Sequence, residues 1–339
     1  MTDMLTRALA ALLLGAAMPA VAAADVWPVA AGGSIQAAID QAVGGDLVAL
    51  DAGSYPGDVD FAGKAITVLG LGPDTVLEGT GGGPVVRFDS NEGPGSVLDS
   101  VVVTGGLAER GGGIYIAGAS PTVVRTIVFG NRARFQGSGI YVSGSSASIR
   151  NNLLLYNGTA AGDPHTIEVQ SAAPAIVNNT IVRNDSNAVI TRGSSAAIIL
   201  NNVLAWNGSR GRGRGICDFS GGVARIGYNL FYRNRKAALL TDGIDFRKIG
   251  RAESRIGPPR LEGNVDGNPR FEMRSGPPRP GSRRQERTTL ADFAAGLQPR
   301  CDGRRQRTYD AGHPDPAYDD LDGTRNDIGF TGGPDAPTW

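Results

Sequence analysis

Two carboxylates are the residues of this sequence best suited to acid–base chemistry. Glu168 lies in the strand-like segment TIEVQ and Asp218 in GICDF, with one further strand-like segment between them. If the segments stack as rungs, the two carboxylates lie about 9.6 Å apart. This is near the upper end of the separation in inverting glycosidases, about 6.5–9.5 Å, so the pair is a candidate hydrolase site. The alternative for Glu168 is a solvated side chain without a catalytic role. The alternative for Asp218 is an inward side chain, because a direct match of GICDF to GIYV puts Cys217 in the outward position.

Four further side chains fall near this pair. Arg192 could take a proton beside a uronate carboxylate and so serve as the base of a polysaccharide lyase. Tyr115 and Tyr141 occupy matching places in GIYIAG and GIYVSG, where exposed aromatic rings suit sugars. We predict these two tyrosines and His165 as substrate-binding residues. The alternative for the tyrosines is ordinary packing.

The sequence gives little support for other kinds of catalytic site. The chain has only two histidines and no G-x-S-x-G segment, which disfavours a Ser-His-Asp hydrolase. Neither C-x-x-C nor H-E-x-x-H occurs, which disfavours zinc. The sequence leaves open whether the protein is an enzyme.

The element that positions these residues is a nine-residue unit that recurs six times at intervals of 23 to 27 residues. Such self-similarity indicates a stacked repeat architecture. The copies are VLDSVVVTG, VVRTIVFGN, IRNNLLLYN, IVNNTIVRN, ILNNVLAWN and IGYNLFYRN, which begin at Val97, Val123, Ile149, Ile176, Ile199 and Ile226.

The fourth position of the unit is always small or amide, and the sixth is always apolar. Side chains two apart on a strand share a face, so both positions should point inward. A buried amide must be hydrogen-bonded, and amides about 4.8 Å apart can bond along the stack. We therefore predict an internal ladder of Ser100, Thr126, Asn152, Asn179, Asn202 and Asn229. The ninth position is mostly Asn, which predicts left-handed turn residues there.

Short strand segments separated by turns, with no crossover-helix pattern, predict an all-β parallel solenoid; a β-sandwich is the alternative. Residues 34–42 predict a short N-terminal capping helix that begins at Ser34. These patterns resemble the right-handed parallel β-helix proteins of the pectin lyase-like superfamily over residues 26–334. The segment YDAGHPDPAYDDLDGTRNDIGFTGGP resembles the tail of bacterial secreted β-helix repeat proteins.

The resemblance implies a polysaccharide ligand along the outer face of one sheet. The catalytic signatures of polygalacturonases, pectin methylesterases and pectate lyases are not found, so the resemblance implies fold and compartment but no reaction. We expect an exported β-helix that binds, and in one alternative cleaves, polysaccharide. The other alternative is a non-catalytic structural or interaction module at the surface or in the periplasm.

The N-terminus predicts export. Residues 1–24 hold a basic start, an apolar run and small residues before Asp25, which is typical of a signal peptide. The apolar run is too short for a membrane span, so we predict a secreted or periplasmic monomer without a membrane anchor. The organisation expected after it is an N-terminal cap and first coils over 25–96, regular coils over 97–240, an irregular basic segment over 241–308 and a cap over 309–339.

Charge is unevenly distributed although the net charge is zero. Residues 210–307 hold 22 basic and 10 acidic groups, a net charge of +12, whereas the flanking segments are acidic. An exported basic surface could bind acidic polysaccharide; the alternative is a solvated, loosely ordered segment. Nucleic acid is not an expected partner, because no nucleic-acid-binding module is present.

Two features near the C-terminus remain open. Cys217 and Cys301 could form a disulfide in an oxidising compartment, or stay free thiols. Asp320, Asp322 and Asp327 are candidate Ca²⁺ ligands, but the spacing is not that of an EF-hand. The Asp-rich segment therefore fits a cap better than a metal site, and no cofactor besides Ca²⁺ is expected.

Overall fold

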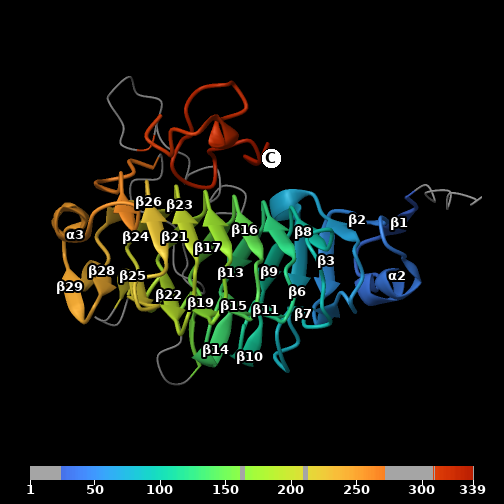
Figure 1. Ribbon diagram of the computed structural model, residues 1–339. Helices are drawn as coiled ribbons and strands as arrows, with labels where there is room; N and C mark the ends of the chain where they lie inside the picture. The colour runs from blue at the N-terminus through green and yellow to red at the C-terminus, as the bar shows by residue number, and fades with distance from the viewer. Residues whose placement is uncertain (1–23, 161–164, 209–212, 272–307, 309, 339) are drawn as a thin grey trace, which may run out of the picture.

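The computed structural model describes residues 24–160, 165–208, 213–271, 308 and 310–338. The chain winds into a parallel β-solenoid, as Figure 1 shows, and the predicted all-β parallel β-helix is confirmed. Three long sheets form its sides, and a small fourth sheet lies on the connections. Among the described residues, none of the helices has the length and apolar character to cross a membrane.

Each sheet is built from one strand of every successive coil. Sheet A contains β1 Val26–Val29, β2 Leu47–Leu50, β5 Thr67–Leu69, β8 Val97–Asp99, β12 Thr122–Val124, β16 Ser148–Arg150, β20 Ala175–Val177, β23 Ile198–Leu200, β26 Arg225–Gly227 and β30 Leu261–Glu262. Sheet B contains β3 Gly53–Pro56, β6 Thr75–Glu78, β9 Val102–Thr104, β13 Ile127–Phe129, β17 Leu153–Leu155, β21 Thr180–Val182, β24 Val203–Ala205, β27 Leu230–Tyr232 and β31 Val265–Asp266.

The remaining two sheets carry the outer surfaces that matter most for ligands. Sheet C contains β4 Val59–Asp60, β7 Val86–Phe88, β11 Ile114–Ala117, β15 Ile140–Ser143, β19 Ile167–Gln170, β22 Val189–Arg192, β25 Arg214–Phe219, β28 Ala237–Thr241 and β29 Ile244–Phe246. Sheet D contains β10 Leu107–Arg110, β14 Arg132–Gln136 and β18 Gly158–Thr159. All pairings are parallel except that of β28 with β29.

Helices are few and short. Helix α2, Ile35–Gln41, begins where Ser34 Oγ accepts a hydrogen bond from the Ala37 N–H, which confirms the predicted capping helix. It buries Ile35 and Ile39 against the first coils at the N-terminal end of the solenoid (Figure 1). Helix α3, Ile249–Ile256, lies at the other end, and the 3₁₀ turns are η1 Gly72–Asp74 and η3 Pro316–Tyr318.

One left-handed residue makes each turn from sheet A to sheet B. The residues at this place have φ of 49–57° and are Ser100, Arg125, Asn151, Asn178, Asn201 and Tyr228. At such a residue the chain changes direction, and the next side chain points into the solenoid. A second left-handed residue ends each strand of sheet B, at Gly105, Gly130, Tyr156, Arg183, Trp206 and Arg233. The left-handed residue is the ninth of the first unit, at Gly105, but the eighth of the other five, so the prediction of the ninth position is wrong for those five units.

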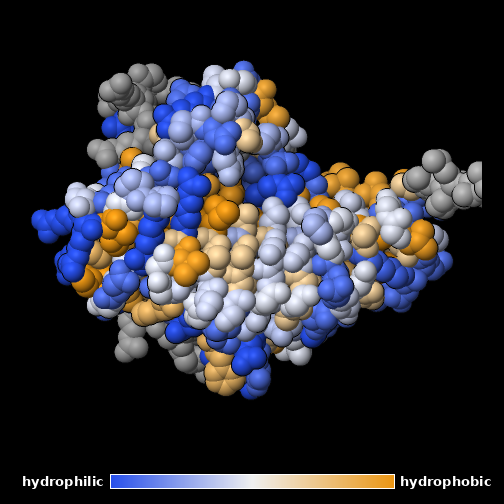
Figure 2. Space-filling view, in the orientation of Figure 1, coloured by the Kyte–Doolittle hydropathy of each residue, from blue (hydrophilic) through white to orange (hydrophobic). Residues whose placement is uncertain are grey.

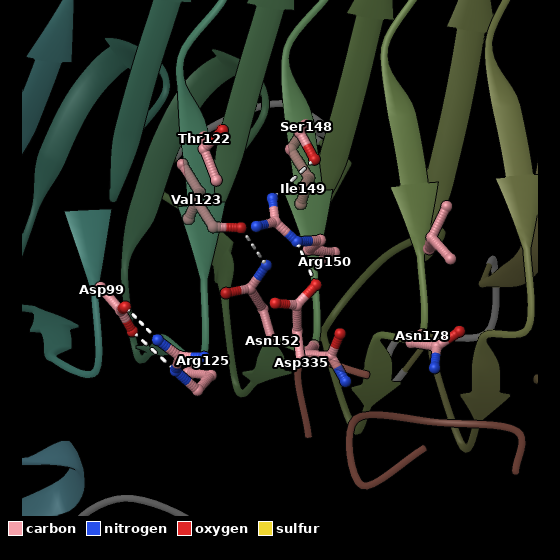
Figure 3. A network of polar contacts seen from close by, with 12 residues as sticks. Asp99, Thr122, Val123, Arg125, Ser148, Ile149, Arg150, Asn152, Asn178 and Asp335 are labelled. Carbon is pink, nitrogen blue, oxygen red and sulfur yellow. Dashed lines mark hydrogen bonds and ion pairs between the residues drawn. The ribbon is translucent and has the colours of Figure 1, made fainter. Parts of the chain in front are cut away.

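The residues that follow the sheet A turns form a buried ladder of side-chain hydrogen bonds. Asn179 Oδ1 accepts from both the N–H and the Nδ2 of Asn152, each at 3.0 Å. Asn152 Nδ2 also donates to Val123 O at 2.9 Å, as Figure 3 shows. The ladder runs through Thr126, Asn152, Asn179, Asn202, Asn229 and Asn264. Asn264 lies beyond the last repeat and was not predicted.

The ninth residues of the unit form a second ladder with the same bonding. Asn157 Oδ1 accepts from the N–H and the Nδ2 of Asn131, at 3.0 and 3.2 Å. Its members are Asn131, Asn157, Asn184, Asn207 and Asn234. Because buried amides cost free energy unless both their donors and acceptors are used, these asparagines serve the fold.

Ser100 is not part of the ladder, contrary to the prediction. Strand pairing sets Leu98 opposite Val123, so that Ser100 falls opposite Arg125 and Val101 takes the ladder place. The first unit, VLDSVVVTG, is apolar at several adjacent positions and fits two registers equally well. Arg125 Nε donates to Asp99 Oδ1 at 2.9 Å across this turn (Figure 3).

The predicted irregular segment, 241–308, begins with regular structure. It contains β29, α3, β30 and β31, and α3 buries Ile249 and Ala252 against the last coil. Residues 272–307 lie outside the described residues, as do residues 1–23 of the predicted signal peptide.

The Asp-rich C-terminal segment lies along the side of the solenoid instead of over its end (Figure 1). Phe330 and Ile328 are buried in an apolar cluster on the outer face of sheet B. Asn151 Nδ2 donates to Phe330 O at 3.1 Å, and Arg150 Nε donates to Asp335 Oδ2 at 2.6 Å, the latter drawn in Figure 3. The segment therefore covers a sheet, while α3 and Asn264 close the C-terminal end.

Candidate functional site

The outer face of sheet C carries one column of side chains in register. From the N-terminal side it consists of Arg87, Tyr115, Tyr141, Glu168, Ile190, Cys217 and Leu240. Their strand neighbours point inward and mostly belong to the main core, with Thr191, Asp218 and Thr241 as buried polar exceptions. The structure thus places Tyr115, Tyr141 and Glu168 on one face, as the sequence predicts.

Asp218 is on the opposite face of sheet C from Glu168, so the two carboxylates do not form a catalytic pair. Pairing sets Cys217 opposite Ile190 and Asp218 opposite Thr191, one residue off the predicted column. Asp218 is 2% exposed and points into the solenoid. Side chains alternate across a strand, so this one-residue shift is enough to reverse the face.

The surroundings of Asp218 indicate a structural role. Its Oδ2 lies 2.8 Å from Arg260 Nη2, and its Oδ1 accepts from Thr191 Oγ1 at 2.7 Å and from the Ser220 N–H at 3.0 Å. Burial raises the pKa of Asp218, but the hydrogen bonds from Ser220, Arg260 and Thr191 together bring that pKa below its ordinary value. A permanently charged, fully bonded carboxylate is suited to holding the last coils together.

Glu168 and Arg192 form a polar cluster with two neighbours. Glu168 Oε1 accepts from Gln136 Nε2 at 2.9 Å and from Arg192 Nε at 3.0 Å. Arg192 Nη2 lies 3.4 Å from His165 Nε2, and His165 Nδ1 lies 2.9 Å from Asn187 Nδ2. Arg192 is thus committed to an ion pair with a carboxylate instead of facing a substrate as a free base. His165 is 6% exposed, so it braces Arg192 and is not presented to a ligand.

Burial raises the pKa of Glu168 above its ordinary value, although hydrogen bonds from Gln136 and Arg192 oppose the shift. The folded state therefore holds a proton on Glu168 at pH values where the unfolded chain has lost it. Its contribution to stability is greatest below the unfolded pKa and is lost as pH rises through the folded pKa.

We expect Glu168→Gln to remove part of this pH dependence. As pH is raised from 4 to 7, the melting temperature of the variant should rise relative to that of wild type, because glutamine does not ionise. Thermal unfolding at several pH values measures it, with the exposed Glu109→Gln as the control. A difference that stays constant across this pH range would contradict the raised pKa.

An arginine- and tyrosine-lined groove lies beside the first part of the column. It has a volume of about 430 Å³, between sheet D and β7–β11, and its walls include Arg87, Arg110, Arg134, Tyr115 and Glu109. We call it the Arg–Tyr groove. Tyr115 was predicted from the sequence but the arginines were not, because they lie outside the nine-residue unit.

Arginines and tyrosines alternate in space at this groove. The rings of Tyr115 and Tyr141 are stacked with their centroids 5.5 Å apart. Arg87 lies over the Tyr115 ring at 5.7 Å, and Arg110 lies over the Tyr141 ring at 5.9 Å. Contacts of this kind hold guanidinium groups in place while their donors stay available to an anion.

The disulfide and Ca²⁺ predictions both fall on the C-terminal half of the chain. Cys217 is a free, buried thiol whose pKa burial raises to about 12, and Cys301 lies outside the described residues. Asp320 accepts hydrogen bonds from the Asp327 and Gly333 N–H groups, and Asp322 from that of Thr324. Asp327 Oδ1 accepts from the Asp310 N–H at 2.8 Å.

These carboxylates therefore satisfy turn amides instead of converging on an ion. Burial raises the pKa of Asp327 to about 7, with a further contribution from the charge of Asp320. In the described ranges no group of three or more His, Cys, Asp or Glu residues could hold a metal. Ca²⁺ is not supported at Asp320, Asp322 and Asp327.

Comparison with known proteins gives one match. Residues 61–265 match the family model described as periplasmic copper-binding protein (NosD). No curated protein and no solved structure matches the chain. The matched region covers most of the solenoid, from the residue after β4 to the first residue of β31.

The family description names copper binding, so we ask whether the residues of this chain fit a copper site. Copper is bound by Cys, His or Met side chains, and cysteine binds metals as the thiolate. The buried Cys217 resists forming a thiolate. His313 packs against Tyr228 and Tyr318, with ring centroids 4.8 and 5.1 Å apart, and lies in a different part of the fold from His165. Over the part of the chain that the structure describes, these residues do not fit a copper site.

The family match covers more than half of the chain and agrees with the parallel β-helix fold. They also agree with the predicted secreted or periplasmic location, because the family is periplasmic. The chain belongs to the NosD family of periplasmic β-helix proteins.

Proposed function

We propose that this protein is a periplasmic β-helix that binds anionic polysaccharide, such as a uronate polymer, in the Arg–Tyr groove without cleaving it. The observation that carries the proposal is the convergence of Arg87, Arg110 and Arg134 on a pocket that also presents Tyr115. Guanidinium groups match carboxylates geometrically, and the Tyr115 ring holds the Arg87 guanidinium in place beside the groove.

The electrostatics of the groove favour an acidic ligand. Three arginines and one glutamate line it, and of the arginines only Arg87 has an ion pair among the described residues, with Asp89 at 3.1 Å. Arg110 and Arg134 are both exposed. Cations that converge without counterions attract an anion, and the attraction weakens with salt.

The positions of the carboxylates support binding without cleavage. A hydrolase needs two carboxyl groups on either side of the scissile bond. Glu168 is buried and Asp218 faces inward, which leaves Glu109 as the acidic residue of the groove. A lyase needs a free base, and Arg192 is paired with Glu168.

The proposal predicts that Arg110→Gln/Arg134→Gln weakens binding of polygalacturonate or alginate about tenfold or more, because two charge-assisted contacts are lost. Isothermal titration calorimetry at low salt measures the affinity, and neutral dextran tests the need for charge. The matched control is Arg251→Gln/Arg255→Gln, which removes the same charge from exposed positions on α3.

Tyr115→Leu should also weaken binding, because it removes the ring over which Arg87 lies. Product assays for reducing ends and unsaturated uronate should stay at background. If wild type binds neither polymer, or if the control variant loses as much affinity as the groove variant, the proposal is wrong. Turnover of either polymer would contradict the absence of cleavage.

A further inference from the structure

A hairpin ends sheet C and brings two basic segments together. Strands β28 and β29 pair antiparallel, with Leu239 opposite Phe246. Asp242 and Gly243 connect them with φ of 50° and 76°, the left-handed pair that a tight hairpin requires. Continued past Phe246, the chain runs back along β28. Arg247 and Lys248 are thereby placed near the residues that precede β28.

These residues line a pocket of about 450 Å³ at the C-terminal end of the solenoid. Its cationic side chains are Arg233, Arg235, Lys236, Arg247 and Lys248. We call it the basic pocket. Figure 2 shows hydrophilic side chains gathered around α3 at this end of the molecule. The volume falls within the range of small-molecule sites, about 300–1,000 Å³.

Most of this positive charge is not neutralised by other residues that the structure describes. Lys236 Nζ lies 3.1 Å from Asp245 Oδ2. Asp266 is the acidic residue of the lining, and it accepts a hydrogen bond from the Ile249 N–H at 3.1 Å. Arg235, Arg247 and Lys248 make no ion pair with any other described residue, and all three are exposed.

The basic pocket differs from the Arg–Tyr groove in the ligand it suits. Five cations surround a space the size of one small ligand, whereas a uronate polymer carries one carboxylate per sugar. Like charges held this close repel each other, so an anion with several charges gains most by entering. Arginine forks bind phosphate with two parallel hydrogen bonds, and lysine adds a point charge.

We propose that the basic pocket binds a ligand with two or more adjacent phosphate charges, such as a diphosphate group. The same chemistry could come from a soluble phosphorylated molecule or from the headgroup of an anionic lipid. Arg235, Arg247 and Lys248 are the residues that contact the phosphates. This site is separate from the Arg–Tyr groove, which lies beside β7 and β11.

The test uses inorganic pyrophosphate as the probe, titrated into the full chain by calorimetry. Arg247→Gln/Lys248→Gln should weaken binding about tenfold or more, since two charged contacts are lost. The control Arg251→Gln/Arg255→Gln removes two equivalent charges from the same region and should stay within about twofold of wild type. Arg110→Gln/Arg134→Gln, in the Arg–Tyr groove, should keep full pyrophosphate affinity.

Vesicles distinguish the source of the phosphate. Co-sedimentation with vesicles that contain cardiolipin, whose headgroup carries two phosphates, but not with phosphatidylcholine vesicles, lost in Arg247→Gln/Lys248→Gln, supports a lipid headgroup. Pyrophosphate binding without vesicle binding supports a soluble ligand. Absence of both, or equal losses in the pocket variant and the α3 control, overturns the proposal. Circular dichroism of each variant shows whether it is folded, and the substituted residues are all exposed.

Discussion

Asn179→Ala is expected to destabilise the protein by about 3–5 kcal/mol, which is the cost of leaving several buried polar groups without partners. Asn179 Oδ1 accepts two hydrogen bonds from Asn152, and its Nδ2 donates to Ile149 O at 2.9 Å and to Asn202 Oδ1 at 3.0 Å. Alanine removes all of them at a position that is 0% exposed, so the former partners are left buried.

Equilibrium unfolding in urea, followed by circular dichroism, measures this effect. Asn268→Ala is the matched control: Asn268 is exposed and accepts one hydrogen bond from the Arg270 N–H, so its loss should cost less than about 1 kcal/mol. Equal destabilisation by the two substitutions would show that the ladder contributes nothing beyond an ordinary surface hydrogen bond.

Phe330→Ala is expected to cost about 3–4 kcal/mol and to release the C-terminal segment from sheet B. The ring is 2% exposed and packs with the outward apolar residues of sheet B, so the substitution leaves a cavity. The backbone around it is also bonded to the solenoid, since the Phe330 N–H donates to Thr180 Oγ1 at 3.1 Å.

Limited proteolysis with mass spectrometry, together with urea unfolding, tests this expectation. Cleavage in residues 308–338 should become faster in Phe330→Ala than in wild type. Leu321→Ala serves as the control, because Leu321 belongs to the same segment and is 66% exposed. If the two variants are cleaved at the same rate, Phe330 does not hold the segment in place.

The repeat made the fold predictable because one interaction is used in every coil. An amide at the same buried position of every repeat is a strong signal for a solenoid, since few folds offer such an amide a hydrogen-bond partner at each repeat. The capping helix was predictable from Ser34 and its apolar spacing. The register of the first unit was not, because Val101 and Val102 are both apolar and each satisfies the pattern.

The candidate site was predictable only in part. Tyr115, Tyr141 and Glu168 follow the coil spacing, so their shared face could be predicted. Asp218 could not be placed, because β25 is six residues long and the alignment of GICDF with shorter strands allows a shift of one. Such a shift moves a side chain from the outside to the core.

The basic residues of both pockets lie outside the repeat. Arg110 and Arg134 come from sheet D, which forms in the variable connections between coils. The basic pocket depends on a reversal of direction at Asp242 and Gly243. That dipeptide is a recognised hairpin signal and would have predicted the turn, although not the pocket that results from it.

The C-terminal segment has a consequence for how the molecule opens. It bonds to equivalent asparagines of three successive coils: Asn151 Nδ2 donates to Gly332 O, Asn178 pairs with Asn326, and Asn201 O accepts from the Gly329 N–H at 2.8 Å. In a solenoid each coil otherwise contacts only its neighbours, so stability spreads by nearest-neighbour coupling. A strap across three coils makes them exchange their amide hydrogens together, as one cooperative unit, and makes the middle of this protein the slowest part to exchange.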